Sequence, residues 1–148
     1  MMIRRNFTKA LLAAALGIPL LATAAVPVIE VYKSASCGCC EEWVKHLRAS
    51  GLKVNTHDVD DTAAYRKKGG IPDELGSCHT GMVNGYALEG HVPASDIKRL
   101  LAEKPKAKGL AVPGMPLGSP GMEAPRKDAY DVLLVKADGR TAIYKHYN

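Results

Sequence analysis

The sequence predicts an α/β fold in which a mixed β-sheet is flanked by helices, and three observations indicate it. Short apolar runs alternate with segments whose apolar residues recur every three or four positions, as in helices that pack on a sheet. Two dipeptides typical of tight hairpin turns, Asn84-Gly85 and Asp138-Gly139, each separate two such runs. A stretch rich in glycine and proline, Gly109–Pro125, interrupts the second half of the chain.

The first elements predict a β-α-β unit. Val28–Tyr32 reads as a buried strand that leads directly into a turn with three cysteines. A helix follows and stops at Ser50-Gly51, and Leu52–Val59 forms a second strand, parallel to the first through a right-handed crossover. The residues that share the apolar face of the helix are Cys40, Trp43, Val44 and Leu47.

The middle of the chain predicts two further helices and a hairpin. Thr62–Lys68 is a short polar helix, and Cys78–Val83 pairs with Tyr86–Gly90 about Asn84-Gly85. Ala94–Glu103 follows as an amphipathic helix. The order β-α-β-α-β-β-α is that of glutaredoxin and thioredoxin, so we expect a thioredoxin-like mixed sheet.

The last third predicts a long loop and an additional hairpin. Gly109–Pro125 holds four glycines and four prolines in 17 residues, which opposes regular structure and predicts an irregular, functional or disordered loop. Tyr130–Lys136 and Thr141–Tyr147 form a C-terminal hairpin that extends the sheet at an edge. In a competing arrangement this hairpin is the core pair, and Val112-Pro113 takes the position of the thioredoxin cis-proline; we favour the first arrangement.

Residues 1–25 predict a cleaved signal peptide, which leaves residues 26–148 as a single exported domain. Basic residues precede an apolar run that ends in the A-x-A site Ala22-Thr23-Ala24. The run is shorter than the roughly 20 residues of a membrane span, so we expect no stable membrane insertion. Only an uncleaved leader would anchor the protein. The Arg4-Arg5 pair also resembles a twin-arginine export signal.

Charge and composition argue against a nucleic-acid partner. The 20 Lys and Arg residues of the chain include three in the leader, so 17 face 15 Asp and Glu in the mature domain. The net charge of the mature domain is therefore close to neutral. Only eight residues are aromatic, and no basic stripe interleaved with aromatic residues is present.

The cysteines are the most informative residues. Cys37, Cys39 and Cys40 lie within four residues, and Cys78 stands alone. Adjacent Cα atoms are about 3.8 Å apart, too close for a comfortable disulfide, which leaves Cys37–Cys40 or a bridge to Cys78 open. The triplet sits where a strand meets a helix N-terminus, whose partial positive charge favours thiolate nucleophiles and metal ligands.

A thioredoxin-like arrangement packs the segment Cys78-His79-Thr80 against the cysteine turn, so we expect the four sulfurs to converge. Soft thiolates select Cu(I), zinc or iron–sulfur clusters. Structural zinc usually draws on two separated pairs of ligands, whereas this turn crowds three ligands together. The crowding suits thiolates that bridge several Cu(I) ions, and a two-iron cluster stays open.

Methionines and histidines supply further candidate ligands. Met115 and Met122 lie in the Gly/Pro loop, and a thioether binds Cu(I) well and zinc poorly. The alternative is that both fill gaps as flexible hydrophobic residues. We expect the loop to fold over the cysteine turn and present one of the two sulfurs. His79 and His91 are candidate ligands or hydrogen-bonding turn residues. The remaining histidines are expected at the surface: His46, His57 and His146.

Four segments together resemble the CopG-type copper-resistance proteins of Gram-negative bacteria. The segments are Cys37-Gly38-Cys39-Cys40, Cys78-His79-Thr80, the run from Gly85 to Ala94, and the run from Gly109 to Glu123. The resemblance spans nearly the whole mature chain. It implies a thioredoxin-like fold, a periplasmic location, and multinuclear copper bridged by the cysteines of the turn and by Cys78.

The leading hypothesis is a periplasmic protein of copper resistance and homeostasis that holds Cu(I), with a Cu(I)/Cu(II) redox step as a further hypothesis. Its partners would be copper ions and other periplasmic copper-handling proteins. A second hypothesis is a metal-free thiol–disulfide oxidoreductase in which Cys37 attacks and Cys40 resolves. Cys39 argues against it, because a third thiol between the pair invites wrong disulfides. A third hypothesis is an iron–sulfur electron carrier.

Overall fold

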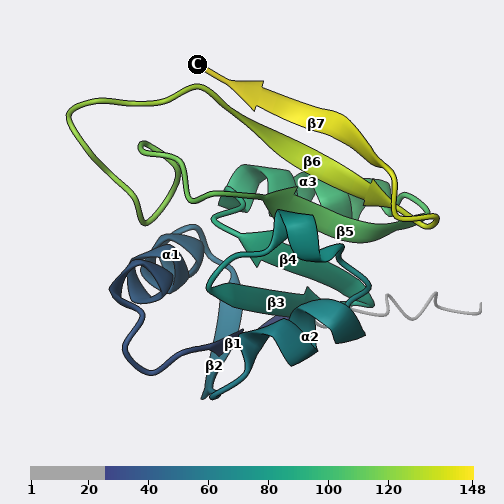
Figure 1. Ribbon diagram of the computed structural model, residues 1–148, viewed down its shortest axis with the longest axis horizontal. Coiled ribbons are helices and arrows are strands. Elements are labelled where there is room, and N and C mark those ends of the chain that lie inside the picture. The colour runs from purple at the N-terminus through teal and green to yellow at the C-terminus, as the bar shows by residue number, and fades with distance from the viewer. Residues whose placement is uncertain (1–25) are drawn as a thin grey trace, which may run out of the picture.

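The computed structural model describes residues 26–148 and contains one seven-stranded sheet in the order β2-β1-β3-β4-β5-β6-β7 (Figure 1). The expected signal peptide, residues 1–25, lies outside the described residues. The elements are β1 (Val28–Lys33), α1 (Gly38–Ala49), β2 (Lys53–Asp58), α2 (Thr62–Lys68), a 3₁₀ turn (Asp73–Leu75), β3 (His79–Val83), β4 (Tyr86–Gly90), α3 (Ala94–Glu103), β5 (Ala107–Val112), β6 (Tyr130–Lys136) and β7 (Thr141–Tyr147).

The predicted strands and helices are present in the predicted order, with the 3₁₀ turn and β5 in addition. β1 and β2 pair in parallel around α1, and β3 and β4 pair antiparallel with β3 next to β1. Asn84 and Gly85 both take positive φ angles, of 47° and 81°, as a type I′ hairpin turn requires. The mixed α/β sheet expected from the sequence is therefore present, and its first four strands follow the favoured arrangement.

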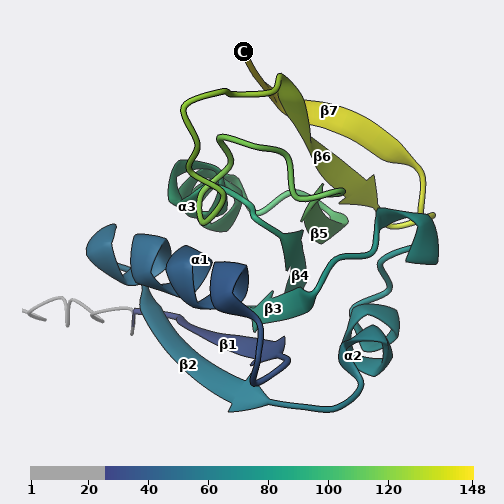
Figure 2. The same cartoon turned by 60° about the vertical axis from the view of Figure 1, so that its left-hand side comes forward.

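Helices cover both faces of the sheet. α1 and α3 lie on one face, and α2 lies on the other (Figure 2). The larger apolar core forms under α1 and α3, where Trp43, Leu47 and Ile97 are fully buried. A smaller cluster on the opposite face contains Ile71, next to the C-terminal end of α2. Among the described residues, no helix combines the length and the apolar character that crossing a membrane requires.

The expectation that Gly109–Pro125 is irregular throughout is wrong at its start. Its first four residues belong to β5, which pairs in parallel with β4. Gly109 is needed there because a Cβ at this position would lie 1.8 Å from the Ala87 carbonyl oxygen. The glycine permits a close approach of two strands rather than a loop.

The competing arrangement, with the last hairpin at the core, is also wrong. β6 pairs with β5 and β7 pairs with β6, so the two strands extend the sheet at one edge. The central pair is β3 and β4, between β1 and β5. The Val112-Pro113 step lies at the end of β5, where the chain leaves the sheet for the loop.

Candidate metal centre

The register of the strands brings four segments that are distant in sequence to the same end of the sheet. β1 ends where the antiparallel β3 begins, and β4 and β5 both end at this same end. Four segments therefore meet there: the cysteine turn after β1, Cys78 before β3, His91 after β4 and the loop after β5. The register pairs at this end of the sheet are Lys33 with His79, Thr80 with Glu89, and Gly90 with Val112.

A buried lysine fixes the cysteine turn to the sheet. The Lys33 ammonium, almost fully buried, lies 2.7 Å from an Asp58 carboxylate oxygen and 2.6 Å from one of Glu41. Asp58 ends β2 and Glu41 belongs to the first turn of α1, so one cation joins three elements around the turn. Hydrogen bonds from Lys33 to Asp58 and Glu41 raise the pKa of Lys33, which keeps it charged.

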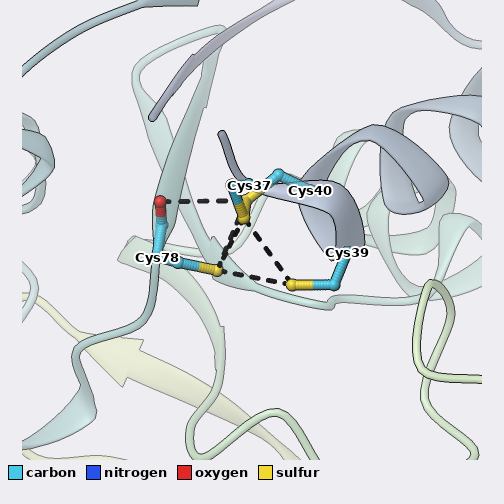
Figure 3. A group of neighbouring side chains, drawn as sticks. All are labelled: Cys37, Cys39, Cys40 and Cys78. Atoms are coloured by element: carbon cyan, nitrogen blue, oxygen red, sulfur yellow. Dashed lines mark hydrogen bonds between the residues drawn. A yellow bond between two sulfur atoms is a disulfide. The ribbon is translucent and has the colours of Figure 1, made fainter. Parts of the chain in front are cut away.

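The four cysteine sulfurs converge as the sequence predicts (Figure 3). Cys37 and Cys40 form a disulfide, whereas Cys39 and Cys78 are free thiols. The Cys78 Sγ lies 3.4 Å from the Cys37 Sγ, 3.3 Å from the Cys40 Sγ and 3.8 Å from the Cys39 Sγ. The Cys37 and Cys39 sulfurs are 3.6 Å apart. Four sulfurs this close can share one metal site once the disulfide is reduced.

The Gly/Pro loop covers the cysteine turn and brings Met115 to it. The Met115 Sδ lies 3.4 Å from the Cys78 Sγ and 4.0 Å from the Cys39 Sγ. Met115 adopts a positive φ angle of 46°, a backbone conformation that residues other than glycine rarely adopt. Such backbone strain clusters at ligand-binding sites.

The far end of the loop packs on the first turn of α1. A Cβ at Gly121 would lie 2.7 Å from the Cys39 carbonyl oxygen and 2.9 Å from the Trp43 amide nitrogen, so only glycine permits this approach. The expectation that the loop folds over the cysteine turn is confirmed. Met122 makes no sulfur hydrogen bond to the cysteines among the described residues, and its role as a ligand stays a prediction.

The Cys78 thiol is held in its protonated form. Burial raises the pKa of Cys78 to about 12, and the nearby Cys39 thiol adds to the effect. A soft metal ion reverses this preference, because coordination stabilises the thiolate and releases its proton. The free thiol is therefore suited to a metal ligand and is a poor nucleophile at neutral pH.

His79 presents a lone pair to Cys78. Its Nε2 lies 3.0 Å from the Gly90 carbonyl oxygen, which only accepts, so Nε2 carries the proton. Nδ1 is then unprotonated and lies 3.8 Å from the Cys78 Sγ. Burial lowers the pKa of His79 to about 3, with His91 as a smaller contribution. A neutral imidazole whose second nitrogen donates to a backbone carbonyl is the usual form of a metal-binding histidine.

His91 contains an unpartnered buried nitrogen. The Ser119 hydroxyl donates to the Pro116 carbonyl at 2.6 Å, so the His91 Nδ1, 3.4 Å from that hydroxyl oxygen, is the donor between the two. The Nε2 then has a free lone pair and no hydrogen-bond partner among the described residues. One nitrogen of each of His79 and His91 lies within 4.8 Å of the other and of the Cys78 sulfur. Burial lowers the pKa of His91 to about 4.

Glu89 supports the site, and the sequence analysis missed it. Its buried carboxylate accepts hydrogen bonds from the Ser77 amide at 2.6 Å and from the Thr80 hydroxyl at 2.6 Å. These two residues flank Cys78-His79, so one side chain fixes the segment that carries both. Burial raises the pKa of Glu89, and the hydrogen bonds from Thr80 and Ser77 oppose that shift. The sequence signal that could have identified Glu89 was its position as a glutamate inside an otherwise apolar strand.

One surface assignment is wrong. His46 is half-buried, and its Nε2 accepts a hydrogen bond from the Ala94 amide at 3.1 Å, at the first residue of α3. Helix N-termini leave amides unpaired, which explains the contact. His57 and His146 are exposed, as expected, and pair with Glu30 and Asp131.

The chain is similar in sequence and fold to solved structures of a copper resistance protein. Residues 75–122 match a family described as a protein of unknown function, DUF411. One solved structure, the copper resistance protein CopG in form 2, has 46% identity and a TM-score of 0.78, and the match covers 82% of this chain and 98% of that chain. Form 1 has 47% identity and a TM-score of 0.77, with coverage of 81% and 96%. No curated protein sequence gives a significant match.

Proposed function

This chain belongs to the family of the copper resistance protein CopG, and on that premise we propose that it binds copper in copper resistance. The metal is Cu(I), held in a multinuclear site by the thiolates of Cys37, Cys39, Cys40 and Cys78. Thiolates and thioethers are the ligands that Cu(I) prefers. A Cu(I)/Cu(II) redox step belongs to the same proposal.

The convergence of five sulfur atoms carries the proposal. Cys78 lies within 3.8 Å of the other three cysteine sulfurs, and the Met115 thioether lies 3.4 Å from it. Several Cu(I) ions that share four thiolates need further ligands, and a neutral thioether adds none of the negative charge that already crowds the site. A zinc site would not need Met115, because a thioether binds zinc poorly.

His79 and His91 provide a nitrogen side to the same site. Both rings are buried and neutral; the unprotonated nitrogen of His79 faces the Cys78 Sγ at 3.8 Å, and that of His91 has no hydrogen-bond partner among the described residues. A buried acceptor without a partner costs free energy, commonly about 1–3 kcal/mol. A copper ion bound to Cys78 would give the His91 nitrogen its missing partner and would lie beside the His79 nitrogen, so we assign both histidines to the inner side of the centre.

The setting of the site belongs to the proposal as well. We assign residues 26–148 to one thioredoxin-like domain, which the strand order β2-β1-β3-β4 and the cysteine turn before α1 support. We place the mature domain in the periplasm, after removal of residues 1–25, where it exchanges copper with other copper-handling proteins. The A-x-A site and the basic, apolar leader support the export step.

A second candidate function is thiol–disulfide exchange without metal. The Cys37–Cys40 disulfide has the C-x-x-C spacing of such enzymes, and Cys37 is the more exposed member of the pair. Cys37 would be the sulfur that a partner thiol attacks, and Cys40 the resolving thiol. An iron–sulfur carrier uses the same sulfur set and stays a third candidate.

Metal analysis of protein from copper-supplemented periplasm distinguishes the three functions. We expect more than one copper per chain, and a sharp loss of copper in Cys78→Ala and Cys39→Ser, with little change in the thermal unfolding of the metal-free proteins. Iron with acid-labile sulfide, and visible absorption, would indicate the iron–sulfur carrier. Protein without bound metal that reduces a disulfide substrate would indicate the oxidoreductase and overturn the copper proposal.

A further inference from the structure

Six lysines lie at the end of the sheet opposite to the metal centre, a surface that we call the basic end. β3 and β6 end here, and β4 and β5 begin here (Figure 1, right). α2 leads to the same end, because a Cβ at Gly69, the residue after this helix, would lie 2.6 Å from the Ala87 Cβ in β4. α3 ends shortly before β5 begins. The six lysines are Lys67, Lys68, Lys104, Lys106, Lys108 and Lys136.

The lysines of the basic end keep their charge uncompensated. None of the six pairs with a carboxylate among residues 26–148, where the ion pairs of lysine belong to other positions. Carboxylates at this end are fewer: Glu103 and Asp138 pair with Arg99 and Arg140, and Glu74 is exposed. The mature domain is close to neutral as a whole, so its positive charge is concentrated at one end.

The end that carries the metal centre has exposed negative charge. Asp60 and Asp61 follow β2 at that end, and Glu123 lies in the Gly/Pro loop. All three side chains are exposed and form no ion pair within the described part of the chain. A negatively charged surface would therefore attract the basic end and repel the opposite end, which would orient the whole molecule.

Apolar side chains accompany the lysines. A hollow of about 350 Å³ is lined by Val26, Leu52 and Leu101 together with Lys98 and Lys104, and the turn between β3 and β4 closes one side of it. Val26 is 53% exposed, which is unusual for a large aliphatic residue in this protein. Aliphatic side chains between the long stems of lysines are typical of surfaces that rest on the polar boundary of a membrane.

The chemistry of lysine favours a surface of many anions over a single acidic group. Arginine binds one carboxylate through a planar fork, whereas the lysine ammonium is a compact charge on a flexible stem. The arginines at this end are engaged in ion pairs within the chain, as Arg99 and Arg140 show, and the unpaired cations are lysines. Phospholipid headgroups present many phosphates to such a field of lysines, and each lysine near an anionic membrane adds to the attraction.

We propose that the basic end binds the surface of a membrane that contains anionic phospholipids. The protein adsorbs to the headgroups without insertion, and the metal centre at the other end faces away from the lipid, open to exchange with its partners. This inference goes beyond the proposed function and does not depend on bound copper, because no lysine of the basic end belongs to the metal centre.

The test is co-sedimentation of the mature protein, purified without added copper, with vesicles. One set of vesicles contains phosphatidylcholine alone, and the other contains an equal mixture of phosphatidylcholine and phosphatidylglycerol. We expect binding to the anionic vesicles only, and release when sodium chloride is raised well above physiological ionic strength, because salt screens exposed charges. No sedimentation with the anionic vesicles would overturn the proposal, whether or not a soluble acidic protein binds the same lysines.

Two paired variants separate the position of the charge from its amount. Lys104→Gln/Lys106→Gln removes two exposed charges from the basic end and should weaken binding to anionic vesicles by at least about tenfold. Lys127→Gln/Lys145→Gln is the matched control, because both lysines are exposed and lie elsewhere, beside the Gly/Pro loop and in β7. The control should change binding by less than about threefold.

Equal weakening in the two variants would mean that net charge alone decides, and would overturn the assignment of the basic end. Thermal unfolding of both variants checks that the fold is intact. Copper content measured on the same proteins should stay unchanged in both. A protein that binds vesicles but no copper would contradict only the proposed function, and one that binds copper but no vesicles would contradict only this inference.

Discussion

At the scale of single residues, the site consists of sulfur and nitrogen atoms that lie close together. Hydrogen bonds to Gly90 and Ser119 fix which nitrogen of His79 and of His91 is unprotonated. Met115 is held by a left-handed backbone rather than by packing in a strand or helix. Each of these residues bears a local cost, in burial or in backbone strain, that a bound metal ion would offset.

The first prediction concerns Met115. Met115→Leu keeps approximate volume, so the metal-free protein should lose less than about 1.5 kcal/mol in its free energy of unfolding. Copper should bind more weakly, and the Cu(I)/Cu(II) potential should fall, because a soft ligand that favours Cu(I) is gone. Competition titration with a Cu(I) chelator measures the affinity. Met122→Leu is the matched comparison, because the Met122 sulfur makes no hydrogen bond to the cysteines among the described residues. Unchanged copper affinity and potential in Met115→Leu would mean that Met115 only packs against the cysteines.

The second prediction concerns His91. His91→Leu removes a buried nitrogen without a partner, so the metal-free protein should be as stable as the original or more stable, by up to about 1 kcal/mol in denaturant unfolding. Copper binding should weaken in the same protein, because the free lone pair is lost. A variant that is less stable and binds copper unchanged would show that His91 has a packing role only.

At the scale of elements, the turn before α1 and the loop after β5 form two sides of one site. The loop approaches α1 so closely that Gly121 touches backbone atoms of Cys39 and Trp43. Lys33 holds the opposite side of the turn through Asp58 and Glu41. The cysteine turn is therefore clamped between the sheet and the loop, and its geometry depends on both.

The third prediction tests that contact. Gly121→Ala should displace the loop from α1, because its Cβ would meet backbone rather than a flexible side chain. We expect faster alkylation of Cys39 by iodoacetamide and weaker copper binding. The free energy of unfolding should also fall by about 1–2 kcal/mol, because alanine is strained in the left-handed conformation. Gly139→Ala is a matched control, since Gly139 has a similar φ and no atom within 4 Å of the added methyl group. Identical alkylation rates in the two variants would contradict the idea that the Gly/Pro loop shields the cysteine turn.

At the scale of the whole molecule, much of the fold was predictable, because local signals agreed with the sheet. Asn84-Gly85 fixed one hairpin, and the spacing from Cys40 to Leu47 fixed α1. β5 was missed, because Gly109 reads as a loop residue until its contact with Ala87 is known. The cysteines and Met115 were identifiable by type, and Glu89 by its place in an apolar strand, whereas the hydrogen bond of His46 depends on a tertiary contact that no local pattern encodes.

The fourth prediction concerns the pH dependence of global unfolding. Burial lowers the pKa of His46, whose Nε2 accepts from the Ala94 amide. As pH falls below about 6.5, the unfolded chain takes up a proton at His46 before the folded protein does, so stability decreases with falling pH. His46→Gln keeps an acceptor that does not titrate and should reduce this decrease between pH 7 and pH 5 in urea unfolding of the metal-free protein, while the buried His79 and His91 maintain the rest of it. An unchanged pH profile would contradict a neutral, buried His46.

The wide separation of the ligands along the chain has a consequence for the order of folding events. Cys39 and Met115 lie 76 residues apart, so they meet only after the strands between them have assembled. The three cysteines of the turn, in contrast, are neighbours in the newly made chain and would capture soft metal ions before any sheet exists. A Cys37–Cys40 bridge closes a very short segment at small entropic cost and removes two of these thiols from premature metallation. Reduction of this disulfide after folding would then delay metal binding until the sheet has assembled around the site.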